Sequence, residues 1–175
     1  NKEILIKGDN VMLGYYNNDV LTKETIDKDG WLSSGDLGFI DKDGFLTIIG
    51  RAKDMIVLST GKNIFPEGIE NVLNESRYIS QSMIYGDKSK HISAIIVPNF
   101  EQLKLWCEKY SIKLNLTDER IVDFYKLKVD HKLKNFAKIE QINSFKLISE
   151  EFSQENGLLT PTLKLKREKV LSKYL

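Results

Sequence analysis

Residues Gly30–Glu70 read GWLSSGDLGFIDKDGFLTIIGRAKDMIVLSTGKNIFPEGIE, and a change of pattern within this stretch decides the fold. Up to about Gly50, short apolar runs alternate with Asp-Gly pairs, which supply the positive φ that tight hairpin turns require. Beyond that point strand-like and helix-like segments alternate. We therefore expect an α+β fold in which hairpins come first and a mixed β-sheet flanked by helices follows a boundary near residues 51–54.

The same two patterns predict secondary structure along the whole chain. Before the boundary it predicts strands at residues 3–7, 10–16, 31–32, 38–40 and 45–49, with a short helical segment at 19–27. After the boundary it predicts strands at 55–58, 82–85, 92–97 and 144–148, and helices that begin at 66 and span 100–110 and 117–136. In the last helix Ile121, Tyr125, Val129 and Leu133 recur every four residues, as a buried helical face requires.

Composition indicates whether the chain can form a core and what kind of partner its charge favours. With 175 residues, 41% of them hydrophobic, the chain can bury a core. Its net charge of +1 gives no sign of a nucleic-acid partner. Charge is nevertheless uneven, because five Lys stand against nine Asp or Glu in residues 1–50, whereas residues 161–175 hold five Lys or Arg against one Glu. The basic end could meet an anion.

Cysteine content and hydropathy indicate the compartment. Cys107 is the only cysteine, so neither an internal disulfide nor a cysteine-built zinc site can form, and no metal site is predicted. A reducing, cytoplasmic setting is the default. No apolar run approaches the roughly 18 residues of a membrane span, and the polar start is no signal peptide. The strand-like start without Met suggests a piece of a longer chain.

Asp36 and Arg51 are candidates for ligand binding. Asp36 follows Gly35, which lets the backbone approach a ligand, and its carboxylate can accept hydrogen bonds from two vicinal hydroxyls such as those of a ribose. Arg51 could make bidentate contacts to phosphate or ribose oxygens. Taken singly, each residue also fits a role without any ligand: Asp36 as an aspartate that stabilises a turn, and Arg51, with Lys53, as part of a solvent-exposed charge cluster.

The tail contains a further candidate. In Leu159–Arg167 (LTPTLKLKR) Lys164 and Lys166 stand two apart, so both would point the same way if the segment is extended. An ammonium aimed between a phosphate and a carboxylate would stabilise charge that develops there, although an ordinary basic tail fits the composition equally well. The histidines, His91 and His131, have no evident partner, and no catalytic triad can be built. The STGKN run at 59–63 lacks the spacing of a Walker loop.

In this order, the pieces resemble the C-terminal part of the adenylate-forming enzymes, which include acyl-CoA synthetases, luciferases and the adenylation domains of peptide synthetases. The tail is most like that of the long-chain fatty acid–CoA ligases, which reads T-P-T, then an apolar residue and Lys. The matching blocks are Gly8–Asn17 (GDNVMLGYYN), Gly30–Gly38 (GWLSSGDLG), Gly50–Ile56 (GRAKDMI) with Gly61, Pro66, Glu67, Ile69 and Glu70, and Leu159–Arg167.

The resemblance implies a domain organisation and a nucleotide site. Residues 1–50 would be the terminal strands of a large N-terminal core domain, and residues 51–175 a small C-terminal lid domain joined by a hinge near 51–54. Asp36 would bind the ribose hydroxyls of ATP, Arg51 would also contact the nucleotide, and Lys53 would stand at the hinge position.

The resemblance also implies two catalytic elements in the lid. Lys164 would hold the carboxylate and the α-phosphate while an acyl-adenylate forms, and Lys164 is preferred to Lys166 because it matches the long-chain pattern. After the lid rotates, the loop of Ser59, Thr60 and Gly61 would let CoA reach the same site. Two departures stand out: Ser34 replaces the usual Thr, and Leu163 stands where the common family tail has Gly.

The function that follows is that of an ATP-dependent long-chain fatty acyl-CoA ligase, with fatty acid, ATP and CoA as substrates and with Mg²⁺ ligands expected outside this chain. This piece alone would be inactive, with its own N-terminal core domain as partner. Peripheral membrane contact is compatible with such a substrate. Two alternatives stay open: an adenylating domain that loads a carrier protein, and a non-catalytic module whose basic tail binds acidic partners or membrane surface.

Overall fold

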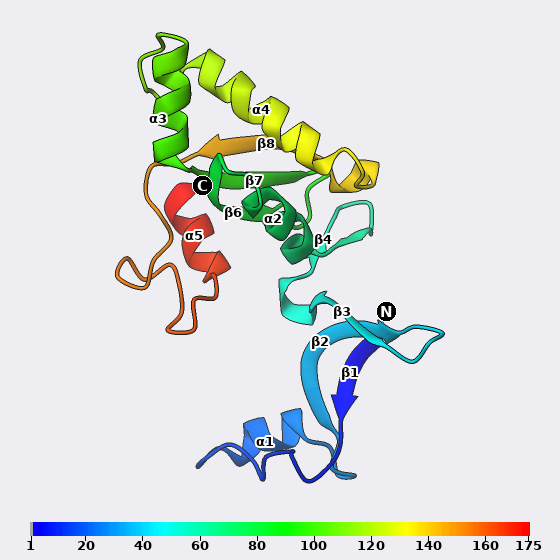
Figure 1. Ribbon diagram of the computed structural model, residues 1–175. Helices are drawn as coiled ribbons and strands as arrows, with labels where there is room; N and C mark the ends of the chain where they lie inside the picture. The colour runs from blue at the N-terminus through cyan, green and yellow to red at the C-terminus, as the bar shows by residue number, and fades with distance from the viewer. Residues whose placement is uncertain (1) are drawn as a thin grey trace. The chain divides into compact units, whose positions relative to one another are not determined.

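The computed structural model describes residues 2–175 and divides the chain into two compact units (Figure 1). The first unit extends to Met55 and the second spans Ile56–Leu175. The domain division expected at residues 51–54 stays a prediction.

The first unit is an antiparallel sheet with one short helix. Its strands β1 (Lys2–Ile6), β2 (Leu32–Ile40) and β3 (Leu46–Arg51) pair in that order, and α1 (Asp19–Thr25) precedes β2. The β2–β3 hairpin turns at an Asx turn in which Asp41 Oδ1 accepts the N–H groups of Asp43 and Phe45, both at 2.9 Å. The predicted Asp-Gly hairpin is thus confirmed.

Two strand predictions in this unit are wrong. Residues 10–16 form no strand, because turns satisfy their backbone: Val11 donates to the Gly8 carbonyl, and Tyr15 donates to Thr22 Oγ1. The separate strands predicted at 31–32 and 38–40 are one continuous strand, β2, so the Ser-Gly-Asp segment lies within a sheet. Many apolar side chains of the unit stay exposed, among them Phe39, Ile40, Phe45, Leu46 and Ile48.

The second unit is built on a mixed sheet. Strands β6 (Ile79–Tyr85) and β7 (Ile92–Pro98) are antiparallel, and β8 (Ile142–Leu147) joins β7 in parallel. A short hairpin, β4 (Ile56–Val57) and β5 (Asn63–Ile64), precedes the sheet. The helices are α2 (Pro66–Asn74), α3 (Phe100–Lys109), α4 (Glu119–Leu133) and α5 (Arg167–Tyr174). The α+β class with helices flanking a mixed sheet is confirmed.

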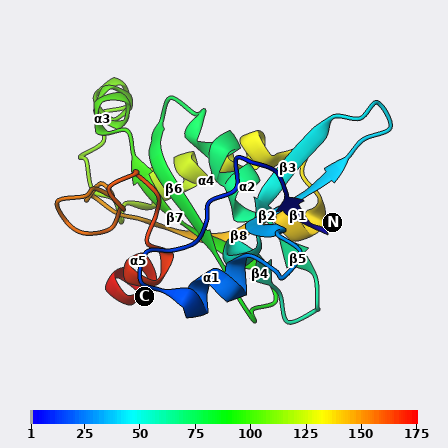
Figure 2. The same ribbon diagram turned by 90° about the horizontal axis from the view of Figure 1, so that it is seen from below.

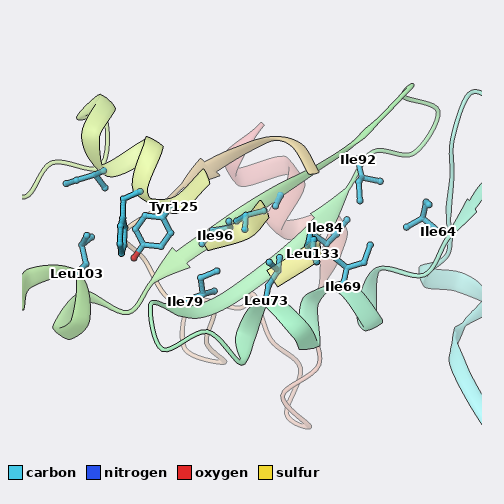
Figure 3. Close-up of a cluster of buried hydrophobic side chains, with 14 of the residues drawn as sticks. Ile64, Ile69, Leu73, Ile79, Ile84, Ile92, Ile96, Leu103, Tyr125 and Leu133 are labelled. Atoms are coloured by element: carbon cyan, nitrogen blue, oxygen red, sulfur yellow. The ribbon is translucent and has the colours of Figure 1, made fainter. Parts of the chain in front are cut away.

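The alternation of side chains along β6 and β7 creates a core on each face of the sheet. Ile84 and Ile96 pack with Leu73 of α2 and Leu133 of α4 on one face (Figure 3). Met83, Ile95 and Val97 pack on the other face with Phe152 and with Val170 of α5. Both faces of this small sheet are therefore covered.

The helices begin where the sequence supplies caps. Asn99 and Asp118 each accept a backbone hydrogen bond in the first turn of α3 and α4, and Pro66 stands in the first turn of α2. The predicted four-residue repeat of α4 is confirmed, since all four of its members are buried. Tyr125 of that repeat donates from its hydroxyl to the Tyr78 carbonyl at 2.8 Å.

The end of the chain differs from the prediction. The segment read as a basic tail contains α5, an eight-residue helix whose Val170 is fully buried. Strand β8 begins at Ile142, two residues earlier than predicted. Within residues 2–175, no helix combines the length and apolar character needed to cross a membrane.

Candidate functional site

The sheet of the first unit brings Asp36 and Arg51 together. The β2–β3 register makes their Cα atoms direct partners, and Arg51 Nε lies 3.4 Å from Asp36 Oδ1. Arg51 Nη2 also donates to the Ser34 carbonyl at 3.2 Å. Because 41% of the Arg51 side chain and 33% of the Asp36 side chain stay exposed, both groups can still reach a ligand.

Gly35 makes this arrangement possible. Its φ is +74°, in the left-handed region that favours glycine, and an added Cβ would lie 2.9 Å from Arg51 Nη2. Ser34 Oγ accepts the Asp36 N–H at 3.0 Å, so the serine that replaces the usual threonine keeps a hydroxyl contact. The strand thus presents a carboxylate acceptor beside a guanidinium donor, a combination that suits a sugar diol next to a phosphate.

Lys53, the predicted hinge residue, lies in a single 3-10 turn, Ala52–Asp54, and its side chain is exposed. The residues on either side, Arg51 and Met55, have extended backbone. The chain therefore changes conformation twice within a few residues where the two compact units meet along the sequence.

Ser59, Thr60 and Gly61 form the exposed turn between β4 and β5. Gly61 has a φ of +75° and donates its N–H to the Leu58 carbonyl at 2.8 Å. The Ser59 N–H donates to the Ser89 carbonyl at 2.9 Å. A left-handed glycine without a side chain leaves room for a ligand to pass beside this backbone.

The base of this turn is fixed to the β6–β7 connection. Asp87 Oδ1 accepts the Val57 N–H at 3.1 Å, and the Lys88 N–H donates to the Val57 carbonyl at 2.8 Å. The turn is therefore carried by the main sheet of the second unit.

Lys164 lies in a tight turn that ends just before α5. Leu159 and Leu165 form a β-bridge, and Thr160 bonds twice with Lys164: its N–H donates to the Lys164 carbonyl at 2.8 Å, and its Oγ1 accepts the Lys164 N–H at 3.0 Å. The Lys164 side chain is exposed, whereas Lys166 is half-buried. Residues 161–163 form the turn itself, whereas Leu165, which lies between the two lysines, takes part in the β-bridge.

Leu163, the residue before Lys164, has a φ of +61°. This left-handed conformation favours glycine. The turn therefore explains why a glycine would suit this position, which Leu163 occupies with a strained φ.

Sequence reasoning missed a buried ion pair beside this turn. Glu70 of α2 has a side chain only 8% exposed, and both of its oxygens accept from Arg167, at 2.8 Å (Nη1 to Oε1) and 2.7 Å (Nη2 to Oε2). Oε1 also accepts the Ile84 N–H at 2.7 Å. The available signal was a glutamate next to Ile69 on the apolar side of α2, where an unpaired charge would be costly.

A second, more exposed pair holds the other end of α5. Hydrogen bonds from Lys173 and Tyr174 lower the pKa of the Glu150 carboxyl. Burial and the bond to Glu150 raise the pKa of Tyr174 to about 12, so its phenol remains a donor at neutral pH. Helix α5 is thus tied at both ends.

Within the second unit the two candidate catalytic elements are separate. The β4–β5 turn and the loop that leads into α5 lie on opposite sides of this unit in both views (Figures 1 and 2). Among residues 2–175, no three His, Cys, Asp or Glu side chains are grouped as metal ligands would be.

A comparison with protein families matches residues 53–174 to a family described as the AMP-binding enzyme C-terminal domain. The long-chain-fatty-acid–CoA ligase FadD15 of Mycobacterium tuberculosis is 35% identical over 178 residues, which cover 98% of this chain and 30% of that protein. The long-chain-fatty-acid–CoA ligase 5 of Rattus norvegicus is 39% identical over 175 residues, which cover 94% of this chain and 25% of that protein. The chain thus spans 25–30% of the length of these relatives.

Solved structures share the fold at lower identity. The adenylation domain of a carboxylate reductase from Mycobacterium chelonae has a TM-score of 0.87 at 23% identity, and the match covers 98% of this chain and 26% of that domain's chain. The A-PCP didomain of a carboxylic acid reductase from Segniliparus rugosus, in complex with AMP, has a TM-score of 0.85 at 23% identity. The match covers 98% of this chain and 23% of the didomain.

Proposed function

This chain belongs to the family of AMP-binding enzyme C-terminal domains, and we propose that it is the C-terminal part of an ATP-dependent long-chain fatty acyl-CoA ligase. The observation that carries the proposal is its 35–39% identity to long-chain-fatty-acid–CoA ligases over nearly its whole length. Residues 1–50 would complete a core domain, and residues 51–175 would form the lid. The two compact units and the 3-10 turn at Ala52–Asp54 support a hinge there.

In the first half-reaction, a carboxylate oxygen of the fatty acid attacks the α-phosphate of ATP and pyrophosphate leaves. Asp36 accepts hydrogen bonds from the ribose hydroxyls, and Arg51 donates to the nucleotide from the neighbouring strand. Lys164 contacts the carboxylate and a phosphate oxygen, and its ammonium stabilises the charge that moves between them. The exposed position of Lys164 in a tight turn supports its role over that of half-buried Lys166.

In the second half-reaction, rotation at Lys53 withdraws Lys164 and brings in the turn of Ser59, Thr60 and Gly61. The pantetheine arm of CoA passes beside Gly61, the thiol attacks the acyl carbonyl, and AMP leaves. The separation of the two elements on opposite sides of the second unit supports this alternation, since a rotation is needed to exchange them (Figure 1).

Mg²⁺ would neutralise charge on the ATP phosphates, but the described residues supply no cluster that fits its ligands. We propose that the metal ligands and the acyl pocket lie in the core domain outside this chain. The chain alone would then be inactive.

The test separates the half-reactions in the full-length ligase. Lys164→Ala should lower acyl-adenylate formation by roughly 10²- to 10³-fold, because it removes a charge that contacts the transition state. Thioester formation from supplied acyl-adenylate and CoA should be largely spared. Lys166→Ala is the matched control and should leave adenylate formation near the wild-type rate.

Equal loss of both half-reactions in Lys164→Ala would contradict the role given to this lysine. Comparing turnover with CoA and with an acyl-carrier protein distinguishes a CoA ligase from a domain that loads a carrier. Salt-sensitive binding of lipid vesicles, without any adenylation, would instead indicate the interaction module.

A further inference from the structure

The side chain of Lys164 must be aimed, yet it lies on an exposed turn. The bonds within the turn, between Thr160 and residues 163 and 164, fix its internal shape. They do not determine how the turn sits on the rest of the domain. That orientation depends on the segments where the turn joins the sheet and α5.

Arg167, only three residues after Lys164, provides a firm attachment. It is the first residue of α5, and both terminal nitrogens of its guanidinium bond to the two carboxylate oxygens of Glu70. Such a bidentate pair fixes direction as well as distance. The Arg167 side chain is 21% exposed and that of Glu70 is 8% exposed, so solvent screens the pair little.

Glu70 is itself held by two elements. It lies in the middle of α2, and its Oε1 accepts the Ile84 N–H of β6. Arg167 Nη1 donates back to the Ile84 carbonyl at 3.2 Å. The guanidinium, the carboxylate and the Ile84 peptide thus form one network that joins α2, β6 and the start of α5.

The chain between this network and Lys164 has little freedom. Leu165 forms the bridge with Leu159, and the Lys166 N–H donates to the Leu158 carbonyl at 2.9 Å. Leu158 is buried in the core beneath α5. A shift of Arg167 would therefore move the whole Lys164 turn as a body.

From this geometry we infer that Glu70 and Arg167 are positioning residues for Lys164 and so for the adenylate-forming step. The inference rests on the proposed function. The pair anchors the lysine turn at its α5 end, whereas the β4–β5 turn is anchored separately through Asp87 and Lys88. Loss of the pair should therefore impair the first half-reaction and spare the second.

The experiment uses the full-length ligase with Arg167→Lys, Arg167→Ala and Glu70→Gln. Pyrophosphate release with ATP and fatty acid should fall about 10- to 100-fold in Arg167→Ala, because a displacement of about 1 Å can cost 10²-fold. Thioester formation from supplied acyl-adenylate should stay within about twofold. Arg167→Lys should recover part of the loss, since a lysine keeps the charge without the bidentate geometry.

Lys132→Ala is the matched control. Lys132 of α4 pairs with Glu75, the residue that caps the C-terminus of α2, but 67% of the Glu75 side chain is exposed. Its removal should leave both half-reactions unchanged. Equal loss of both half-reactions in Arg167→Ala, or no loss in either, would overturn the inference.

Hydrogen exchange gives a readout that does not need activity. In Arg167→Ala and Glu70→Gln, amides of residues 158–166 should gain more in exchange rate than those of α4 (Glu119–Leu133), which should stay protected and so show that the domain is folded. An increase at 158–166 no larger than that at α4 would overturn the inference. If wild-type enzyme releases no pyrophosphate with any fatty acid, the proposed function fails, and the exchange result alone decides whether the pair holds the turn.

Discussion

The buried pair of Glu70 and Arg167 should couple more strongly than the exposed pair of Glu75 and Lys132, and a double-mutant cycle measures both. Glu70 is 8% exposed and accepts from two guanidinium nitrogens and one backbone N–H. Removing one partner of such a pair leaves a buried charge unpaired and costs roughly 3–5 kcal/mol. Because Arg167 is 21% exposed, we expect each single change to alanine to cost about 3 kcal/mol, the low end of that range.

Removing both partners leaves no orphan charge, so the double change should cost less than the sum of the single changes. We expect a coupling energy of about 2–3 kcal/mol for this pair. The Glu75–Lys132 contact is one 3.1 Å bond between side chains that are 67% and 28% exposed. Its coupling should be about 0.2–1 kcal/mol, as for other exposed pairs.

Urea unfolding followed by tryptophan fluorescence gives these energies. Trp106 stacks on Phe124 in the second unit at a centroid distance of 4.2 Å, whereas Trp31 lies in the first unit. In the 175-residue chain, which holds these two tryptophans, a Trp31→Phe background therefore makes the signal report the second unit alone. A coupling for Glu70–Arg167 no larger than that for Glu75–Lys132 would refute the claim that the buried pair fixes the start of α5.

Three other predictions follow from single positions. Leu163→Gly should change the urea midpoint little, within about 0.5 kcal/mol, because relief of a left-handed φ worth about 1 kcal/mol offsets the added freedom of the unfolded chain; a loss above 2 kcal/mol would contradict this. Gly35→Ala should raise the KM for ATP but not for fatty acid, since its Cβ would lie 2.9 Å from Arg51 Nη2, and an unchanged ATP KM would count against the site. Because the pKa of the Glu150 carboxyl is lowered in the folded chain, its ionised form stabilises the fold at pH values above its ordinary pKa of about 4.3. This stabilisation is lost as the pH falls through the lowered pKa. Glu150→Gln should therefore be less stable than wild type at pH 7, with a gap that closes on acidification; a gap that widens in acid would have the wrong sign.

The fold class could be predicted because its signals are local. The four-residue repeat of α4 and the Asp-Gly turn after β2 each contain their own periodicity or turn chemistry. The strand predicted at residues 10–16 failed because apolar residues there serve turns, and alternation over so few residues does not distinguish the two. Helix α5 was missed because its stability comes from Val170 packing and from Glu70, which lies 97 residues away.

The candidate site was predictable only in its residue types. The resemblance named Asp36 and Arg51, but their pairing depends on the β2–β3 register, and that register includes an irregularity between Leu37 and Gly38 which no local pattern announces. The left-handed φ of Leu163 was equally hidden, because leucine gives no signal for it. Glu70 could be suspected from its place on α2, but its partner could not.

Pyrophosphate release by the full-length ligase tests the central claim most directly. The assay supplies ATP, Mg²⁺ and a series of fatty acids from short to long, with and without CoA. The account predicts release that peaks with long acids and proceeds to acyl-CoA and AMP when CoA is present. Release with amino or aryl acids, and none with any fatty acid, would contradict the assignment to long-chain fatty acyl-CoA ligases.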